Sequence, residues 1–296
     1  MSVHLVLIDA LNLIRRIYAV QERPFLATSH YIKRANRETP QALSDSTKKQ
    51  VLFNTQQACT LALKKIVERL CPTHALVVFD SQAPCWRYTL YPDYKKGRKK
   101  IPDHLAAQLP HMQDDFMTLN IDSLTSDEDE ADDLIATLAI KVALRGQKVT
   151  IVSTDKGFLP LINHNIEVYD HFNRRYLDAE HVQNKFNIKP SQLVDFWMLT
   201  GDSTNKIPGI TGIGQITASA LLNQYGSLAA LLKADDVKIA IKEKLENASE
   251  QLVMTRKLLT LKHDIPLGFN LKDIRIAQSS EAKPTQNIGN LQSNQA

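Results

Sequence analysis

Cysteine is scarce in this chain, and no two cysteines are spaced for a metal or redox site. The 296 residues include three cysteines, Cys59, Cys71 and Cys85, without a C-x-x-C pair. An odd and widely spaced set argues against both a disulfide framework and a zinc site. This usage predicts a protein of a reducing compartment.

Long apolar runs are also missing. No stretch reaches the roughly 18 residues of a membrane-spanning helix. The N-terminus has no basic region followed by an apolar core and a small-residue cleavage site, which is the pattern of a signal peptide. We therefore expect a soluble cytoplasmic protein.

The chain has no large excess of charge of either sign. Its net charge of +4 and isoelectric point near 8.8 are only mildly basic, so an interaction with nucleic acid must depend on where the charges cluster. The 43% hydrophobic content supports a real core. A chain of this length can form one large and one small domain.

Three apolar segments that read as β-strands end in an aspartate. LVLID ends in Asp9, HALVVFD in Asp80 and VTIVSTD in Asp155. Helical patterns alternate with these strands, which predicts a right-handed parallel α/β sheet over residues 1–180. Ligands bind such sheets at the edge formed by the carboxyl ends of the strands, so we expect the three acids to meet there.

The rest of the chain divides by composition. Residues 28–50 are polar and are expected to form a flexible insertion, whereas residues 181–276 show helical patterns with glycine turns and predict a small all-helical domain. Residues 277–296 are too polar to pack and are expected to be a disordered tail. We expect helices over residues 11–20, 51–70, 102–119, 131–145, 193–199, 217–224, 227–232, 237–247 and 250–261.

A dense run of acids, SDEDEADDLIATLA, opens one of these helices. Favourable interaction with the helix dipole would explain one or two acids, whereas a longer run repels itself unless cations neutralise it. Oxygen ligands without a histidine partner indicate magnesium or manganese rather than zinc. The candidate metal ligands are seven acids, most of them at strand ends or at this helix start: Asp9, Asp80, Glu130, Asp132, Asp133, Asp155 and Asp202.

Basic and aromatic residues alternate in WRYTLYPDYKKGRKKIP. A solvated charge run is the alternative explanation, but cations can bind phosphates while unpaired bases stack on neighbouring rings. The candidate DNA-binding residues of this segment are Arg87, Tyr91, Tyr94, Lys95 and Arg98.

A glycine-rich hairpin, IPGITGIGQITASALL, precedes a later helix. It lacks the GK[ST] of a Walker A loop and the third glycine of a dinucleotide fingerprint. A plain helix cap and turn is one explanation. A helix-hairpin-helix, whose backbone N–H groups bind a DNA phosphate, is the other.

Together these segments resemble the 5′-nuclease or flap endonuclease superfamily. The resemblance runs from about residue 3 to residue 261 through LIDALNLIRR, YPDYKKGR, EADDLIATLA, VSTDKG and GIGQITA. It implies a PIN-like nuclease domain with a helical arch, here residues 86–112, followed by a helix-three-turn-helix domain.

The resemblance also implies roles for particular residues. Lys95 and Arg98 would be the arch cations that steer the scissile phosphate, and Asp132 would be catalytic in the first metal site. A potassium ion would be held by the backbone carbonyls of Leu199, Thr200, Pro208, Ile210 and Ile213. The hairpin residues that contact the DNA phosphate would be Gly212, Ile213, Gly214, Gln215, Ile216 and Thr217.

The sequence departs from the family at the second metal site. Family members commonly read STDKD and GDSSDN, where this chain has Gly157 after Lys156 and the run GDSTNK around Asp202. Two of the three ligands of that site are therefore absent, and Lys206 adds a positive charge.

The expected function is that of a magnesium-dependent, structure-specific nuclease that cuts 5′ flaps near a single-strand to duplex junction, with possible 5′-3′ exonuclease action. We expect a monomer with DNA as its partner. A non-catalytic or weakly active DNA-structure binding protein is the alternative. A phosphatase that uses Asp80 as its nucleophile is disfavoured because Asp80-Ser81-Gln82 lacks a D-x-D pair.

Overall fold

A parallel sheet forms the centre of the molecule. The computed structural model describes residues 2–36, 43–81, 83–126 and 128–276. The strands run in the order β3-β2-β1-β4-β5-β6, with the first five parallel and β6 antiparallel to β5. Their bounds are β1 His4–Asp9, β2 His74–Phe79, β3 Asp122–Thr125, β4 Lys148–Val152, β5 Ile166–Asp170 and β6 Arg175–Leu177. The predicted parallel α/β sheet is confirmed.

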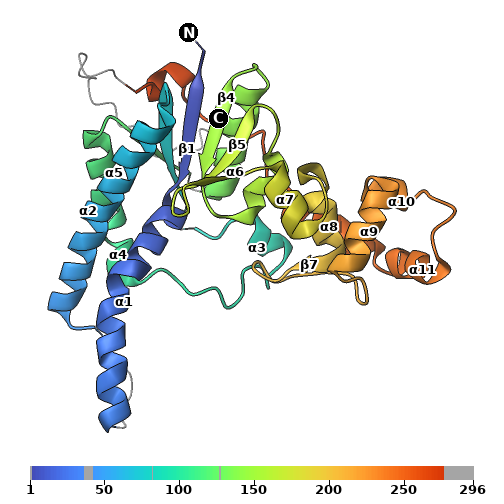
Figure 1. Cartoon of the computed structure of the whole chain (residues 1–296), viewed down its shortest axis with the longest axis horizontal. Coiled ribbons are helices and arrows are strands. Elements are labelled where there is room, and N and C mark those ends of the chain that lie inside the picture. The colour runs from blue at the N-terminus through green and yellow to red at the C-terminus, as the bar shows by residue number, and fades with distance from the viewer. Residues whose placement is uncertain (1, 37–42, 82, 127, 277–296) are drawn as a thin grey trace.

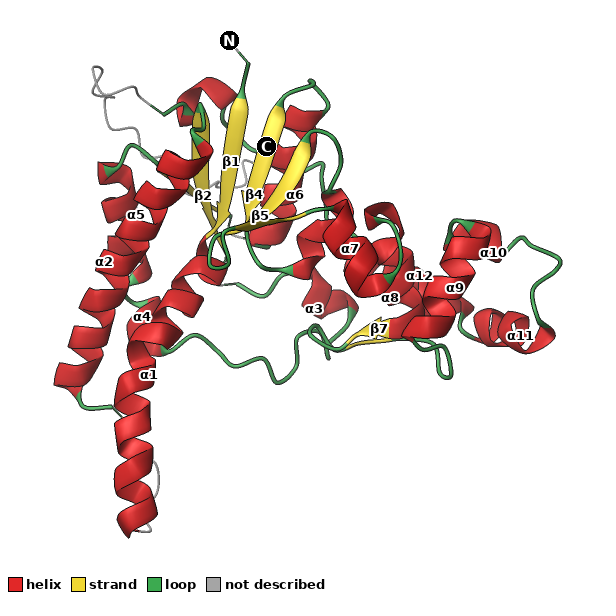
Figure 2. Ribbon diagram, in the orientation of Figure 1, coloured by secondary structure: helices red, strands yellow, loops and turns green. Residues whose placement is uncertain are grey.

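Helices cover both faces of this sheet (Figures 1 and 2). Successive side chains of a strand point to opposite faces. Accordingly, Leu5 and Leu7 belong to the cluster that includes α6 (Ala131–Ala143), whereas Val6 and Ile8 belong to the cluster of α1 (Ala10–Asn36), α2 (Asp45–Leu70) and α5 (Leu109–Thr118). The central strands are apolar on both faces because both faces are buried.

The described residues of the polar segment 28–50, which was expected to be a flexible insertion, are largely helical. Residues 28–36 continue α1 and residues 45–50 begin α2, while residues 37–42 lie outside the described part. Ser44 caps α2 by accepting a hydrogen bond from the backbone N–H of Thr47. Figure 1 shows α1 projecting well beyond the sheet.

The segment 86–112 crosses below the carboxyl ends of the strands mainly as coil. It contains α3 (Trp86–Leu90) and α4 (Asp103–Ala106) and then enters α5. Lys95 and Gly97 have positive φ angles of 53° and 78°. Pro92 and Pro102 lack a backbone N–H, so they also oppose a continuous helix here.

The C-terminal part is helical, with one exception. The expected helices appear as α8 Leu193–Thr200, α9 Gln215–Tyr225, α10 Leu228–Leu231, α11 Ile239–Asn247 and α12 Ser249–Leu259, and α7 Ala179–Phe186 precedes them. The exception is an antiparallel pair of β7 (Gly201–Asp202) and β8 (Ile207–Pro208). The predicted tail, 277–296, lies outside the described residues. Among the described helices, none is both long and apolar enough to span a membrane.

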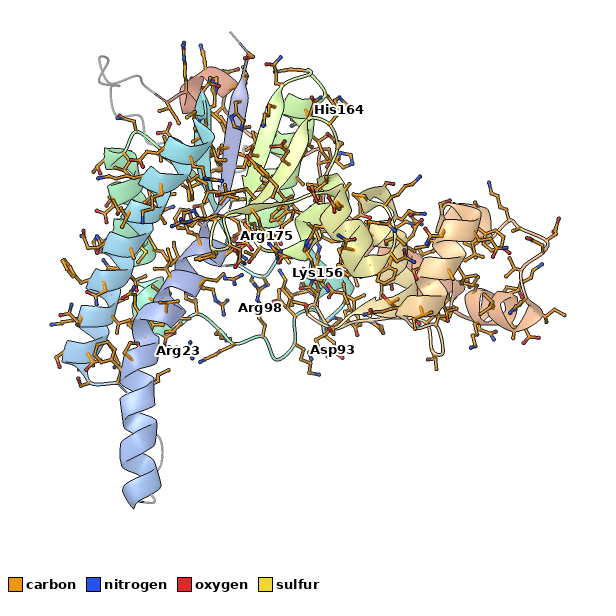
Figure 3. All side chains as sticks on the ribbon, in the orientation of Figure 1. Arg23, Asp93, Arg98, Lys156, His164 and Arg175 are labelled. Carbon is orange, nitrogen blue, oxygen red and sulfur yellow. The ribbon has the colours of Figure 1, made fainter. Side chains whose placement is uncertain are left out.

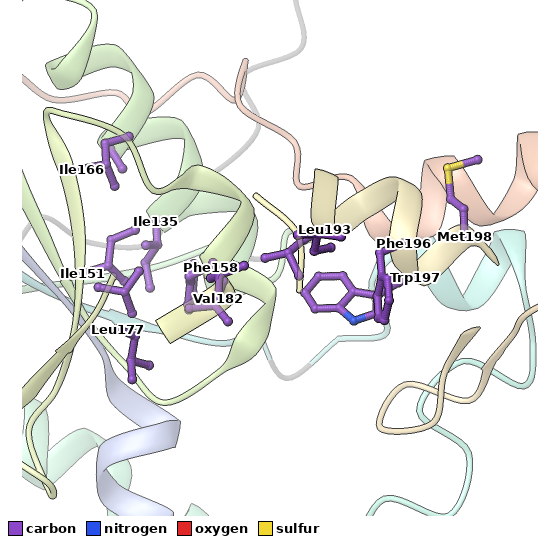
Figure 4. Close-up of a cluster of buried hydrophobic side chains, with 14 of the residues drawn as sticks. Ile135, Ile151, Phe158, Ile166, Leu177, Val182, Leu193, Phe196, Trp197 and Met198 are labelled. Carbon is purple, nitrogen blue, oxygen red and sulfur yellow. The ribbon is translucent and has the colours of Figure 1, made fainter. Parts of the chain in front are cut away.

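One continuous core joins the sheet to these helices. Figure 4 shows Ile151 of the sheet, Phe158 and Val182 leading to Phe196 and Trp197 of α8. All five side chains are at most 4% exposed. This shared core holds the C-terminal helices in a fixed position beside the sheet.

Candidate functional site

Four aspartates meet at the carboxyl ends of the central strands. The sheet order reverses between β1 and β4, which is the point where open α/β sheets bind ligands. A cavity of about 260 Å³ opens there, and we call it the acid cavity. Its lining residues are Asp9, Leu11, Asn12, Arg15, Arg16, Asp80, Lys95, Arg98, Asp132, Thr154 and Asp155.

Hydrogen bonds orient three of these carboxylates. Asp9 ends β1 and accepts from the backbone N–H of Asn12 at 3.1 Å and from the hydroxyl of Ser153 at 2.9 Å. Asp80 accepts from the N–H of Ala131 at 2.9 Å, at the start of α6. Asp155 accepts from the N–H of Gly157 at 2.8 Å. Strand ends and a helix start therefore hold the acids rigidly at one edge.

The acids repel one another in this buried place. Burial and the nearby charge of Asp80 raise the pKa of Asp9 to about 7. Burial and the charge of Asp155 raise the pKa of Asp132 well above its ordinary value. Carboxylates that resist ionisation can be brought to their charged form by bound cations.

The donor set of the acid cavity suits hydrated magnesium or manganese. Its ligands are carboxylate oxygens, which these hard ions prefer. In the described part of the chain, no three His, Cys, Asp or Glu side chains already form a closed metal cluster. Magnesium commonly keeps several waters and binds through one or two carboxylates plus a substrate phosphate. An open set of four aspartates fits that mode.

Two of the expected metal ligands lie elsewhere. Asp133 is fully buried and accepts both Nη groups of Arg87 at 2.7 Å, while Glu130 accepts from Arg87 at 2.6 Å and from Lys95. Although burial would raise the pKa of Glu130, Lys95 and Arg87 lower it. The Asp133 oxygens are committed to this internal ion pair, and the expected role of Asp133 as a metal ligand stays a prediction. Glu130 acts in the same network and does not line the acid cavity.

Two of the expected DNA contacts are also internal. Arg87 is 1% exposed and Tyr94 is 4% exposed. The Tyr94 hydroxyl donates to Glu130 at 3.3 Å. Half-buried Tyr91 packs on a small cluster that includes Cys85, Ile207 and Leu258. The fold uses Arg87 to join α3 to α6 and α12 and buries Tyr94 against Glu130, so the expected DNA contacts of both residues stay predictions.

The acid cavity contains cations that the sequence argument did not assign. Arg15 and Arg16 of α1 line it together with Lys95 and Arg98. Arg15 donates to the carbonyl of Lys99 at 2.6 Å, and Arg16 donates to the hydroxyl of Thr154. Figure 3 shows Arg98, Lys156 and Arg175 around one end of the sheet, with His164 at the opposite end. The available signal was their position in the first two turns of α1, which begins directly after the strand-end acid Asp9.

Asp202 is paired within the protein. Its carboxylate accepts from Lys156 at 2.6 Å, from the N–H of Thr204 at 3.0 Å and from the Asn205 amide at 2.7 Å. The Lys156 ammonium also lies 5.2 Å from the centre of the Trp197 ring. A lysine charge therefore already neutralises the acid that was expected to serve the second metal site.

The glycine hairpin presents its tip to solvent. Gly212, Gly214, Gln215 and Ile216 are exposed, whereas Thr217 is half-buried and Ile213 is buried. The Lys244 ammonium donates to the carbonyl of Gly212 at 3.3 Å, a cation that the sequence argument missed. Such a tip can offer backbone N–H groups and charge to a phosphate.

Several carbonyls expected to bind potassium already accept hydrogen bonds. Leu199 accepts from the N–H of Ile210 at 2.8 Å, and Ile210 accepts from the N–H of Ile213 at 3.0 Å. Pro208 accepts from Gln251 at 3.2 Å. Each carbonyl oxygen has a second lone pair, so potassium binding here stays a prediction.

Comparison with known proteins identifies both parts of the chain. Residues 4–187 match the family described as 5′-3′ exonuclease, N-terminal resolvase-like domain, and residues 188–282 match 5′-3′ exonuclease, C-terminal SAM fold. The protein named Flap endonuclease Xni of Colwellia psychrerythraea is 66% identical over 95% of each chain. That of Psychromonas ingrahamii is 45% identical over 94% of this chain and 98% of its own.

Solved structures share the fold. The T5 D15 protein co-crystallised with metal ions matches with a TM-score of 0.64 and 17% identity, covering 87% of this chain and 89% of its own. The expected architecture, a nuclease domain with a parallel sheet followed by a smaller helical domain, is confirmed. The chain belongs to the 5′-3′ exonuclease family and is a structure-specific nuclease of the flap endonuclease type.

Proposed function

We propose that this protein hydrolyses phosphodiesters of 5′-flap DNA near the single-strand to duplex junction, with magnesium, or manganese in its place, held in the acid cavity. The observation that carries the proposal is the convergence of four aspartates and four cations on one cavity, Asp9, Asp80, Asp132, Asp155, Arg15, Arg16, Lys95 and Arg98. Its curated relatives bear the name flap endonuclease.

The four aspartates would hold the divalent ions. When bound, such ions lower the pKa of a water and stabilise the charge that develops on a phosphate. The chain itself supplies orientation, because the hydrogen bonds to Asp9, Asp80 and Asp155 fix the carboxylates before any ligand arrives.

Lys95 and Arg98 would hold the scissile phosphate beside these acids. Both line the acid cavity, and Lys95 reaches it from a backbone turn fixed by its N–H bond to the carbonyl of Asn205 at 2.9 Å. Glu130 would position Lys95 rather than bind metal.

The glycine hairpin would grip the duplex without reading its sequence. Residues 212–217 would contact the backbone phosphates, aided by Lys244 and by potassium bound to the surrounding carbonyls. The protein would act as a monomer in the cytoplasm. Its three cysteines are all free thiols, in keeping with a reducing compartment.

Cleavage of defined substrates tests this proposal. The purified chain should cut a labelled 5′-flap duplex near the junction in magnesium and potassium, and should cut neither a blunt duplex nor a free single strand at a comparable rate. Chelation of the metal with EDTA should stop cleavage. Equal cleavage of all three substrates would contradict the structure specificity, and cleavage in EDTA would contradict the metal requirement.

A further inference from the structure

A second basic groove lies between α2 and the turn that joins β5 to β6. Its volume is about 640 Å³, within the roughly 300–1,000 Å³ of small-molecule sites. Lys65 and Arg69 of α2 line one side, and Arg174 of the turn lines the other. We call it the α2 groove. None of its residues belongs to the acid cavity or the glycine hairpin.

The cations of the α2 groove are available to a ligand. Lys65, Arg69 and Arg174 are exposed, and none of them forms an ion pair with another described residue. Glu68 is the acid in the lining, so the three cations leave the groove with a positive charge. A cluster of unpaired cations of this kind fits the phosphates of a nucleic acid.

Aromatic rings lie among these cations. His171 and Phe172 line the α2 groove and are half-buried. Burial and the charges of Lys65 and Arg174 lower the pKa of His171, so both cations act on the same imidazole. Tyr169 also lines the groove, and its buried hydroxyl has no hydrogen-bond partner among the described residues. Cations interleaved with rings are typical of sites where unpaired bases stack.

Arg16 connects the α2 groove to the acid cavity. Its side chain lines the acid cavity, and its guanidinium carbon lies 4.8 Å from the centre of the Phe172 ring, which lines the α2 groove. Figure 1 shows β7 and α9, which flank the glycine hairpin, on the side of the sheet away from α2. Asp155 of the acid cavity also lines a small pocket with Asp202 of β7. A strand that crosses the acid cavity away from the hairpin would therefore meet the α2 groove.

We propose that the α2 groove binds a single-stranded segment of the DNA substrate, with phosphates on Lys65, Arg69 and Arg174 and bases stacked beside His171 and Phe172. This inference rests on the proposed function for the identity of the substrate. It adds a binding site outside the acid cavity, and that site is specific for unpaired rather than paired DNA.

Binding measured without divalent metal tests the site apart from cleavage. Fluorescence anisotropy would compare a labelled oligothymidylate and a blunt duplex on the wild type, on K65E/R69E and on K64E. Lys64 is an exposed neighbour on α2 that does not line the groove, so K64E shows the effect of one charge reversal on α2 outside the groove. Circular dichroism would show that each variant is folded.

The double variant should bind the single strand about tenfold more weakly. Its slope of log affinity against log salt should fall by about 1–2, since each lost phosphate contact removes roughly 0.7 for a single strand. K64E should bind the single strand with an affinity within about twofold of the wild type. The affinity of K65E/R69E for the blunt duplex should also change less than about twofold. H171A should weaken the single strand about fivefold at an unchanged salt slope, because stacking does not release counterions.

Wild-type affinity of K65E/R69E for the single strand would overturn the inference. So would an equal loss of affinity for the blunt duplex, which would show a general electrostatic effect. A wild type that binds the single strand in this way but cuts no flap would contradict the proposed function and leave the binding site standing.

Discussion

At the scale of single residues, the aspartates of the acid cavity repel one another when ionised, and bound cations would reduce this repulsion. Asp9 has a pKa raised to about 7 by burial and by Asp80. Its folded pKa lies above its unfolded value near 4. The protonated Asp9 carboxyl therefore contributes stability that is fully present below about pH 4 and is lost as the pH rises through 7. Without metal, ionisation of the cavity should weaken the fold at neutral and alkaline pH.

Asp132→Asn should raise the free energy of unfolding of the metal-free protein. The gain over the wild type should be larger at pH 8 than at pH 5. The amide removes a carboxylate whose pKa burial and Asp155 raise. Because this carboxylate is costly to ionise in the folded state, we expect a gain in stability that grows from pH 5 to pH 8. Urea unfolding in EDTA at both pH values measures it, with exposed Asp235→Asn as control. An equal gain at both pH values would contradict the electrostatic cause.

Lys156 should compete with a second divalent ion for Asp202. The pair is 2.6 Å apart, and the Lys156 side chain is 28% exposed. Lys156→Met should therefore strengthen a weak second manganese-binding event about fivefold, since a partly exposed pair is worth about 1 kcal/mol. Isothermal titration calorimetry measures the two events, and Lys156→Arg keeps the charge as control. An unchanged second affinity would show that Asp202 takes no part in metal binding.

At the scale of elements, the glycine hairpin depends on a close backbone approach. A Cβ atom at Gly209 would lie 2.2 Å from the carbonyl carbon of Thr200 and 2.4 Å from the backbone nitrogen of Gly201. Backbone atoms cannot rotate away as a flexible side chain can. The β7–β8 pair and the start of the hairpin therefore require glycine at this position.

Gly209→Ala should lower the free energy of unfolding by about 2 kcal/mol or more, because it forces two backbone segments apart. It should also weaken duplex binding. Gly214→Ala is the matched control for stability, since a Cβ there meets nothing within 4 Å. Thermal unfolding and duplex-binding titrations measure both effects. A Gly209→Ala protein as stable as the wild type would contradict the tight approach.

Local patterns predicted the elements better than they predicted the partners of single side chains. Asp9 and Asp80 could be placed because an apolar strand fixes where its last residue emerges. Asp132 and Asp133 are neighbours in the sequence, but successive helix positions face different directions. Only the fold shows that Asp133 meets Arg87, whose guanidinium also donates to the distant carbonyl of Leu258 at 3.0 Å. Such long-range pairing leaves no local signature.

At the scale of the whole molecule, Arg87 and the shared core hold the glycine hairpin in a fixed position relative to the acid cavity. Arg87 bridges α3, α6 and the carbonyls at the end of α12. Arg87→Ala should cost roughly 3–5 kcal/mol, because it leaves the buried Asp133 carboxylate without its counterion and removes one of the two cations paired with Glu130. Chemical denaturation measures this cost, with exposed Arg145→Ala as control. A loss below about 1 kcal/mol would show that the bridge is dispensable.

In this protein the acid cavity is expected to cleave the DNA that the rest of the molecule binds. The most direct test compares cleavage and binding of a labelled 5′-flap duplex by wild type and Asp132→Ala in magnesium and potassium. We predict that cleavage falls roughly 100-fold or more while flap binding is retained. Undiminished cleavage by Asp132→Ala would contradict the claim, as would a wild type that binds the flap but cuts it in neither magnesium nor manganese.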